Sequence, residues 1–248
     1  MSTRNVMFLT VIAIVGMVAG AAFAEPATAA PAAPAAAAAP AAAPAASADG
    51  KEAIKIDLPE PFFGGTPLDY WSPTLEPEDY KDRAPYLAPK GTVLISKGKP
   101  VTSSAKAALM GDLKQITDGD KDYTKTSLVE LPSGPQWVQV DLGQDNTIYA
   151  VVVWHFHEGK RVYFDVIAQV ASDPEFKSGV TTIYNNDADN TAGQGVGKDK
   201  EYIENHRGRL IGIDNGVKGR YVRLYTGGNT ANDLNHCVEV EVFGQPAK

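Results

Sequence analysis

The sequence predicts an all-β fold, an antiparallel β-sandwich of the jelly-roll type, preceded by a signal peptide and a disordered Ala/Pro-rich linker. Three observations favour this fold. Short segments in which apolar and polar residues alternate follow one another from Gly91 onward. The loops between them are rich in Gly, Asn and Asp, and few stretches have the spacing of a helix. Many short strands with little helix are typical of sandwiches and barrels.

The first element is an export signal. Residues 6–22 are largely apolar, one Arg and no acid precede them, and Ala22-Phe23-Ala24 matches a small-x-small cleavage pattern. We interpret residues 1–24 as a secretory signal peptide; the alternative is an uncleaved membrane anchor, because about 17 apolar residues can just span a bilayer. The single cysteine, Cys237, has no disulfide partner in the chain. Export without disulfides predicts a secreted, periplasmic or cell-envelope protein of a bacterium.

Two segments rich in proline follow the signal. Residues 25–50 hold 16 Ala and 5 Pro in 26 positions, and because proline interrupts helices we expect a disordered spacer. Residues 51–90 contain 7 Pro and six aromatic residues. Since aromatic side chains favour burial, we expect residues 51–90 to be an extended strap laid over the domain at 91–248; the alternative is an exposed motif for a protein partner.

The domain at 91–248 contains five clear strand patterns. They lie at 136–142, 148–157, 161–171, 220–225 and 236–243. A turn at 158–160 predicts that the second and third form a hairpin. Alternation in the last strand turns valines inward and Glu239 and Glu241 outward. Brief helices are predicted at 104–113 and 173–177.

Charge and motifs exclude several function classes. The net charge is −7, from 23 Lys+Arg and 30 Asp+Glu, and the chain has no Lys/Arg cluster. An acidic surface argues against nucleic acid and anionic lipid as partners, so we expect no nucleic acid and no membrane insertion after signal cleavage. Neither Gly-x-Ser-x-Gly nor His-Glu-x-x-His is present. The protein is therefore predicted not to be an enzyme.

Five segments, in order along the domain, carry a family resemblance. They are Lys99-Pro-Val-Thr-Ser-Ser104, Ile116-Thr-Asp-Gly-Asp120, Gln136-Trp-Val-Gln-Val-Asp-Leu-Gly143, Arg220-Tyr-Val-Arg-Leu224 and Glu239-Val-Glu-Val-Phe-Gly244. Over residues 92–246 they resemble the discoidin, or coagulation factor 5/8 type C, domain. The resemblance implies a galactose-binding-like jelly roll that binds sugars, glycans or lipid head groups through loops at one end, without catalysis. An insertion at 185–218 and the segment Trp154-His-Phe-His157 depart from the family, which weakens any transfer of a known ligand.

A cation site is indicated at the loop Asp118-Gly119-Asp120. Carboxylates two residues apart around a glycine suit Ca²⁺, which takes oxygen ligands. In sugar-binding members of the resembled family, this loop and the first Glu of the C-terminal strand hold a structural calcium. The resemblance therefore implies Ca²⁺ as cofactor, with Asp118, Asp120 and Glu239 as ligands. The alternative is an ordinary Asp-Gly turn with Glu239 in solvent.

Two histidines suggest a second kind of metal site. On a strand, His155 and His157 would project from one face about 6.6 Å apart, a spacing that allows a shared transition metal. His236, Asp187 or Asp189 could complete such a site. The alternative is that these histidines hydrogen-bond a ligand or the backbone.

Two loops add polar candidates. Residues 185–190 alternate Asn and Asp as calcium loops do, although these residues also favour plain turns. Residues 227–236 place amides and an imidazole where they suit a hydroxyl-rich ligand or cap their own loop.

We predict an exported, non-catalytic module that binds carbohydrate or another hydroxyl-rich ligand through loops at one end of the sandwich. The predicted ligand-binding residues are His155, His157, Arg161, Asp187, Asp189, Asn190, Asn229 and His236. Two alternatives remain. One is a structural envelope protein whose strap docks a protein partner, and the other is a metal-dependent enzyme that uses the two histidines.

Overall fold

The computed structural model of the chain describes residues 50–62, 69–79 and 81–247. The chain divides into two units, Met1–Ala42 and Ala43–Lys248, and all the described residues lie in the second. The predicted signal peptide and nearly all of the predicted linker lie outside the described residues. Among the described residues, no helix is long and apolar enough to cross a lipid bilayer.

The described unit is all-β, as predicted. Its elements are β1 (Lys51–Ala53), β2 (Leu87–Pro89), β3 (Val93–Leu94), β4 (Val101–Ser103), the 3₁₀ helix η1 (Leu113–Thr117), β5 (Val129–Leu131), β6 (Gln136–Trp154), β7 (Ile167–Ala171), β8 (Thr181–Asn185), β9 (Arg209–Thr226), β10 (Asn235–Cys237) and β11 (Glu239–Pro246). All pairings between these strands are antiparallel. The predicted fold class is therefore confirmed.

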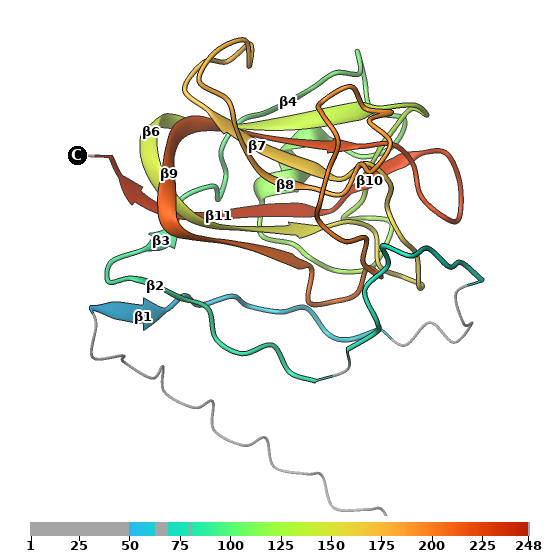
Figure 1. Cartoon of the computed structure of the whole chain (residues 1–248), viewed down its shortest axis with the longest axis horizontal. Helices are drawn as coiled ribbons and strands as arrows, with labels where there is room; N and C mark the ends of the chain where they lie inside the picture. Colours follow the sequence, from blue (N-terminus) through green and yellow to red (C-terminus); the bar gives the residue numbers. More distant parts are fainter. Residues whose placement is uncertain (1–49, 63–68, 80, 248) are drawn as a thin grey trace, which may run out of the picture. The chain divides into compact units, whose positions relative to one another are not determined.

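Two long strands, β6 and β9, carry the main sheet (Figure 1). Over the described ranges, seven strands form this sheet in the order β3-β11-β6-β9-β7-β8, with β4 attached to β6. The first part of β6 pairs with β4, and its second part pairs with β11. Both long strands curve sharply at the left of Figure 1, so each serves two parts of the sandwich.

The main sheet is buried on both faces, and β6 shows this most clearly. Val151 and Val153 belong to one core cluster, whereas the alternating Trp154 belongs to a second. The second cluster also contains Ile54, which follows β1, and Ala88 of β2. The strap therefore closes the second core cluster.

The strap also contacts the predicted insertion. Tyr70 packs its ring 5.7 Å from that of Phe164, and its hydroxyl donates to Glu201 Oε1 at 2.8 Å. Leu75 forms a parallel bridge with the same Glu201, and Thr74 donates to its second oxygen at 2.9 Å. Glu201 thus holds the strap at three positions, Tyr70 and Thr74 through its buried carboxylate and Leu75 through its backbone.

The predicted hairpin between 148–157 and 161–171 is wrong. β7 pairs with β8 and β9, and β6 pairs with β4, β9 and β11. A turn signal predicts that the chain reverses, but it does not determine which strand becomes the neighbour. The first half of the predicted third strand, before Ile167, is loop.

Two smaller predictions also need correction. The helix expected at 104–113 is absent; η1 begins at Leu113, where Asp112 and Gln115 form a capping box. Glu239 and Glu241 do point away from the valines, but they are 1 % and 3 % exposed. They lie on the same face of the sheet as Trp154. The sequence pattern gave no reason to expect that other residues would cover this face.

Candidate binding site

Most of the predicted ligand-binding side chains lie inside the protein. Five of the eight are at most 4 % exposed: His155, His157, Asp187, Asn229 and His236. Asp189 and Asn190 are exposed and Arg161 is half-buried. The structure therefore does not assemble the eight residues into one open site on the loops.

His155 and His236 belong to a cluster of five side chains that we call the buried network. His155 Nδ1 lies 2.8 Å from Glu204 Oε2, and its ring stacks on Tyr163 at 4.3 Å. The Tyr163 hydroxyl lies 2.8 Å from His236 Nδ1, and His236 Nε2 lies 3.1 Å from Glu130 Oε2. These contacts support an internal, structural role for both histidines.

Burial decides the protonation of His236. It lowers the pKa of this imidazole to about 4; the Arg161 charge also lowers the pKa, while the hydrogen bond to Glu130 raises it. His236 is therefore neutral at pH 7. Its Nε2–H donates to the Glu130 carboxylate, which leaves Nδ1 to accept from the Tyr163 hydroxyl.

His157 lies in a different environment from His155. Its Nε2 donates to the Lys121 carbonyl at 3.0 Å, and its buried Nδ1 has no hydrogen-bond partner among the described residues. Because β6 ends at Trp154, the two histidines are not on a strand as predicted. The single trio of metal-binding side chains found among the described residues includes neither of them, so the structure does not form the expected two-histidine metal site.

That trio consists of Asp165, Asp187 and Asp189, whose carboxylate oxygens lie within 4.8 Å of one another. Thr191 Oγ1 donates to Asp165 at 3.0 Å and to Asp189 at 2.8 Å. Burial raises the pKa of Asp165; the hydrogen bond from Thr191 opposes this rise, and the charges of Asp187 and Asp189 add to it. Sequence reasoning named the 185–190 loop but missed Asp165, which precedes β7 and carries no local signal.

The amides of the two predicted loops mostly cap turns. Asn190 Oδ1 accepts the Gly195 N–H at 2.6 Å. Asn229 Oδ1 accepts the Ala231 N–H at 2.9 Å, and its Nδ2 donates to the Leu234 carbonyl at 2.9 Å. Asn229 therefore follows the alternative given for this loop, in which the side-chain amide hydrogen-bonds the backbone of its own loop.

The three predicted calcium ligands do not form a trio within 4.8 Å among the described residues. Asp120 is bound to its own loop, because its oxygens accept from Ser127 Oγ at 2.8 Å and from the Asp122 N–H at 3.0 Å. Glu239 Oε2 accepts the Gly119 N–H at 3.1 Å. Burial raises the pKa of Glu239 to about 8, and the nearby Asp118 adds to the rise.

Glu239 and Asp118 nevertheless fit a cation better than they fit an empty loop. A buried carboxylate is normally paired or bound to a metal, and Glu239 has one hydrogen bond to the described residues. The nearby buried ammonium of Lys121 is paired with Glu241, 2.6 Å away. Asp118 Oδ1 accepts the Asp120 N–H at 2.8 Å, and its second oxygen has no hydrogen bond to the described residues. Glu239 and Asp118 thus keep oxygens that suit Ca²⁺, whereas both oxygens of Asp120 are bonded within its loop.

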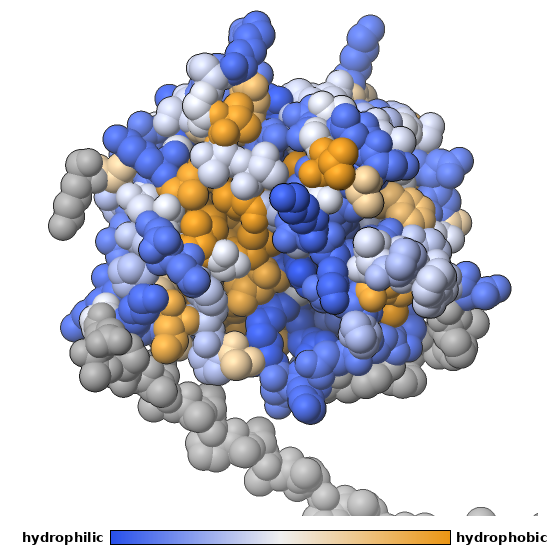
Figure 2. Space-filling view, viewed as in Figure 1, coloured by the Kyte–Doolittle hydropathy of each residue, from blue (hydrophilic) through white to orange (hydrophobic). Residues whose placement is uncertain are grey.

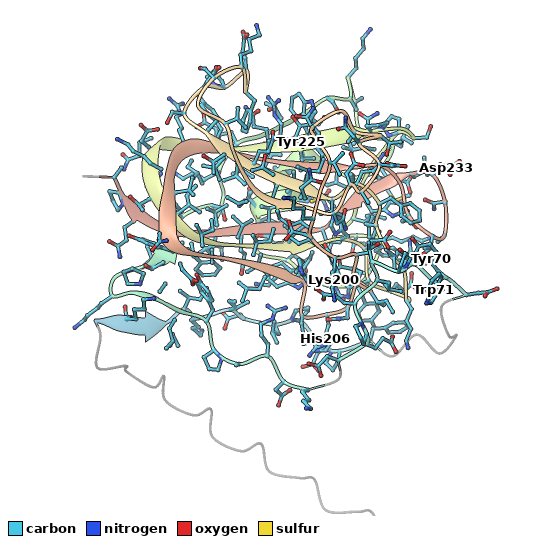
Figure 3. The ribbon with its side chains drawn as sticks, in the orientation of Figure 1. Tyr70, Trp71, Lys200, His206, Tyr225 and Asp233 are labelled. Carbon is cyan, nitrogen blue, oxygen red and sulfur yellow. The ribbon has the colours of Figure 1, made fainter. Side chains whose placement is uncertain are left out.

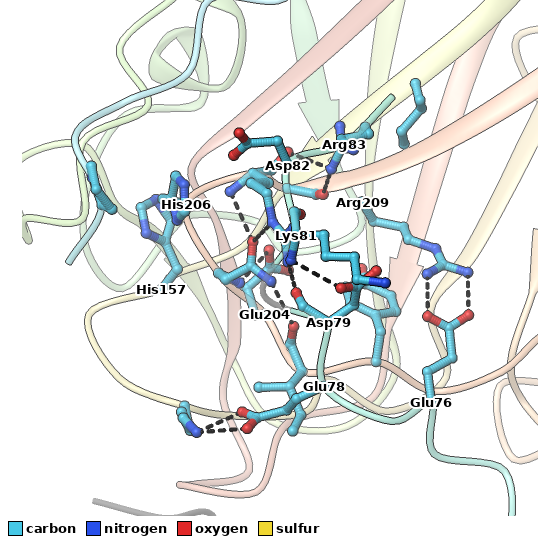
Figure 4. Close-up of a pocket in the computed structure, with 18 of the residues that line it drawn as sticks. Glu76, Glu78, Asp79, Lys81, Asp82, Arg83, His157, Glu204, His206 and Arg209 are labelled. Carbon is cyan, nitrogen blue, oxygen red and sulfur yellow. Dashed lines mark hydrogen bonds and ion pairs between the residues drawn. The ribbon is translucent and has the colours of Figure 1, made fainter. Parts of the chain in front are cut away.

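A cavity of about 720 Å³ lies between the strap and the loops at 157–160 and 202–210 (Figure 4). Phe62 and the strap residues 76–79 and 81–84 form one wall. His157 and His206, which Figure 4 shows beside each other, lie on the opposite wall. The face drawn in Figure 2 combines an apolar band (orange) with hydrophilic areas (blue), and Figure 3 shows where Lys200 and His206 of the insertion lie on it.

Arginines join the two walls of the cavity. Arg83 of the strap donates to the carbonyls of Arg207, at 2.7 Å, and Gly208. Arg207 donates in return to the carbonyls of Asp79 and Lys81. A Cβ at Gly208, where φ is +60°, would lie 2.7 Å from the Trp154 ring, so only glycine lets the loop pass here.

Two ion pairs complete the junction. Arg209 forms a bidentate pair with Glu76, at 2.8 and 2.9 Å, and Lys160 lies 2.6 Å from Glu78. Sequence reasoning missed this cavity. The paired residues are separated by 82 and 133 residues along the chain, and the strap's aromatic residues predicted only that it covers part of the domain.

Comparisons with known proteins place the fold. The model of the "NedA-like, galactose-binding domain" family, an F5/F8 type C family, matches residues 115–224. No protein among the curated ones matches the chain. The solved structures that match include the CBM32 of AlyQ in complex with 4,5-unsaturated mannuronic acid, which is 21 % identical with a TM-score of 0.42 over 58 % of this chain and 93 % of that chain.

Two further solved structures are similar at the same level. Chitosan-binding module 1, from a chitosanase/glucanase of Paenibacillus sp. IK-5, is 19 % identical with a TM-score of 0.42, over 61 % of this chain and 98 % of that chain. The family 89 glycoside hydrolase from Clostridium perfringens is 22 % identical with a TM-score of 0.45, over 62 % of this chain and 15 % of that chain. The match at residues 115–224, from η1 to β9, is to the galactose-binding-like F5/F8 type C model that the sequence landmarks predicted.

Proposed function

We propose that this protein is an exported, non-catalytic module that binds carbohydrate or another hydroxyl-rich ligand, and that the ligand occupies the cavity beside the strap. The observation that carries this proposal is the cavity itself, whose wall combines two imidazoles, His157 and His206, with the ring of Phe62. The buried Nδ1 of His157 has no hydrogen-bond partner among the described residues, which costs about 1–3 kcal/mol. A ligand hydroxyl would recover that cost once the His157 ring turns Nδ1 toward the cavity.

The other groups of the cavity also suit a sugar. The Nε2 of His157 donates to the Lys121 carbonyl, while the half-buried His206 offers a second imidazole with no side-chain hydrogen bond to the described residues. Phe62 is 40 % exposed and stacks on Tyr123 at 4.4 Å, which presents an apolar ring beside the polar groups. An apolar surface with a few placed polar groups is typical of small-ligand sites.

The match to a galactose-binding domain supports binding rather than catalysis. Export is proposed from the apolar segment and cleavage pattern before Glu25, and it places the ligand outside the cytoplasm. A structural calcium held by Asp118 and Glu239 is part of the same proposal. Its support is the buried, sparsely bonded Glu239 carboxylate.

Binding of the full chain to an array of oligosaccharides, followed by titration calorimetry on the best ligand, tests the function. We expect His206→Ala and Phe62→Ala each to weaken binding about tenfold, because each removes a contact from the cavity wall. Leu109→Ala, at an exposed residue that does not line the cavity, is the matched control and should bind like the unaltered chain.

Two results would contradict the proposal. One is the absence of binding to any glycan with calcium present. The other is normal binding by both cavity variants with a loss in Leu109→Ala, which would move the site elsewhere.

A further inference from the structure

The cavity is lined by five acidic and five basic side chains, but their partners differ. Three of the acids have cationic or imidazole partners: Glu76 has Arg209, Glu78 has Lys160, and Glu204 has His155. The other two acids, Asp79 and Asp82, are exposed to solvent, where charge is well screened. Three of the five acids are therefore paired within the protein, and the other two face solvent.

Among the five basic side chains, Lys160 and Arg209 pair with acids and Lys81 is exposed, which leaves two half-buried guanidinium groups. Arg83 and Arg207 use their guanidinium groups on backbone carbonyls, and the one side-chain acceptor of Arg207 is the amide oxygen of Asn205. Carbonyl and amide oxygens accept hydrogen bonds but carry no full negative charge. No ion pair joins either guanidinium to a carboxylate among the described residues.

Burial and the neighbouring positive charges lower the pKa of two groups on this wall. Burial and the charges of Arg207 and Arg209 lower the pKa of Arg83. Burial lowers the pKa of His206, and Arg207, His157 and Arg83 lower it further, with Asp82 opposing them more weakly. One part of the cavity wall thus holds more positive charge than its surroundings compensate.

We propose that the cavity binds a carboxylated sugar, with the uronate carboxylate beside Arg83 and Arg207 and the sugar hydroxyls toward His157 and His206. This rests on the proposed function and adds the ligand class to it. A guanidinium matches a carboxylate in a planar, two-bond geometry that a neutral hydroxyl cannot reproduce. The chain's overall charge of −7 makes this local excess the more selective, because an anionic polymer would be repelled elsewhere.

The test compares oligouronates of the glucuronic, galacturonic and mannuronic types, each beside its carboxyl-reduced neutral form, by calorimetry on the full chain. The quantity measured is the affinity for the acid divided by that for the reduced form. We expect at least one uronate to give a ratio of about ten or more, and the ratio to fall as NaCl is raised.

Three variants locate the effect. Arg207→Gln should bring the ratio close to one, and Arg207→Lys, which keeps the charge without the planar fork, should leave an intermediate ratio. Arg220→Gln removes the same charge outside the cavity, where Arg220 pairs with Asp141, and should keep the full ratio. Melting curves establish that each variant is folded. If Arg207→Gln does not fold, Arg207→Lys and the salt dependence carry the test.

The failures are distinguishable. Equal or tighter binding of the reduced sugars overturns the uronate assignment and leaves carbohydrate binding intact. Stronger binding of a sulfated oligosaccharide than of every uronate also overturns it. An unchanged ratio in Arg207→Gln shows that the arginines only join the walls, and a chain that binds neither the acids nor the reduced forms overturns both proposals.

Discussion

The buried network and the cavity use the same residue types but bond them to different degrees. In the buried network, His236 has a hydroxyl on one ring nitrogen and a carboxylate on the other, while His155 has Glu204 on Nδ1 and no partner for Nε2 among the described residues. In the cavity, His157 has one partner, and His206 has no side-chain partner among the described residues. The comparison shows that a histidine beside a loop does not by itself indicate a ligand site. The hydrogen-bond partners of both ring nitrogens must be known first.

Breaking the buried network should have the largest effect. His155→Ala removes a fully buried ring from Tyr163 and leaves the Glu204 carboxylate without its partner. We expect the free energy of unfolding, measured with urea, to fall by about 3–5 kcal/mol. His206→Ala, the matched change in the cavity, should alter it by no more than about 0.5 kcal/mol. Equal losses in both variants would remove the distinction between the two regions.

The pH dependence of stability sharpens the comparison. The folded pKa of His236, about 4, lies below its ordinary value of 6.5, so the unfolded chain binds more protons between these values. The stability that this group contributes is present above pH 6.5 and is lost as pH falls through the window, by about 3 kcal/mol in total. His236→Gln should flatten the curve of unfolding free energy against pH between 6.5 and 4. A curve as steep as that of the unaltered chain would show that other groups, such as Glu130 or Arg161, govern this range.

Calcium should act at a third place, separate from both regions. At about 100 times the dissociation constant, an ion bound only to the folded state adds about 2.7 kcal/mol, which raises the melting temperature by several degrees. We expect this shift on adding Ca²⁺ to chelator-treated protein, and its loss in Glu239→Gln. Asp189→Asn, in the exposed part of the acidic trio, is the control and should keep the shift. The reverse pattern would place the ion at the trio.

The sequence predicted the fold class well because alternation along a strand is local information. Val238, Val240 and Val242 are buried as their spacing indicates. Strand pairing is not local, so the hairpin after His157 was wrong, and the continuity of β6 through the predicted gap at 143–147 was missed.

The site was harder to predict, because burial depends on what covers a surface. Nothing in the sequence near His155 or Glu239 shows that their surroundings are enclosed. The reciprocal bonds of Arg83 and Arg207 join the strap to a loop 124 residues further on, and no periodicity records a contact of that kind. The proline and aromatic residues of the strap were the available signal. They indicated that the strap packs on the domain, but not which part of the domain it contacts.

The second core cluster has a consequence for where this domain begins. The family match starts at residue 115, and the landmarks at about residue 92. Ile54 and Ala88 lie before both, yet they close the core around Trp154. A fragment expressed from Gly91 would therefore expose an apolar face, the kind of surface that promotes aggregation. The segment that matches the family model is shorter than the segment that packs around one core. A domain boundary drawn at the start of the family match would therefore cut through the core of this protein.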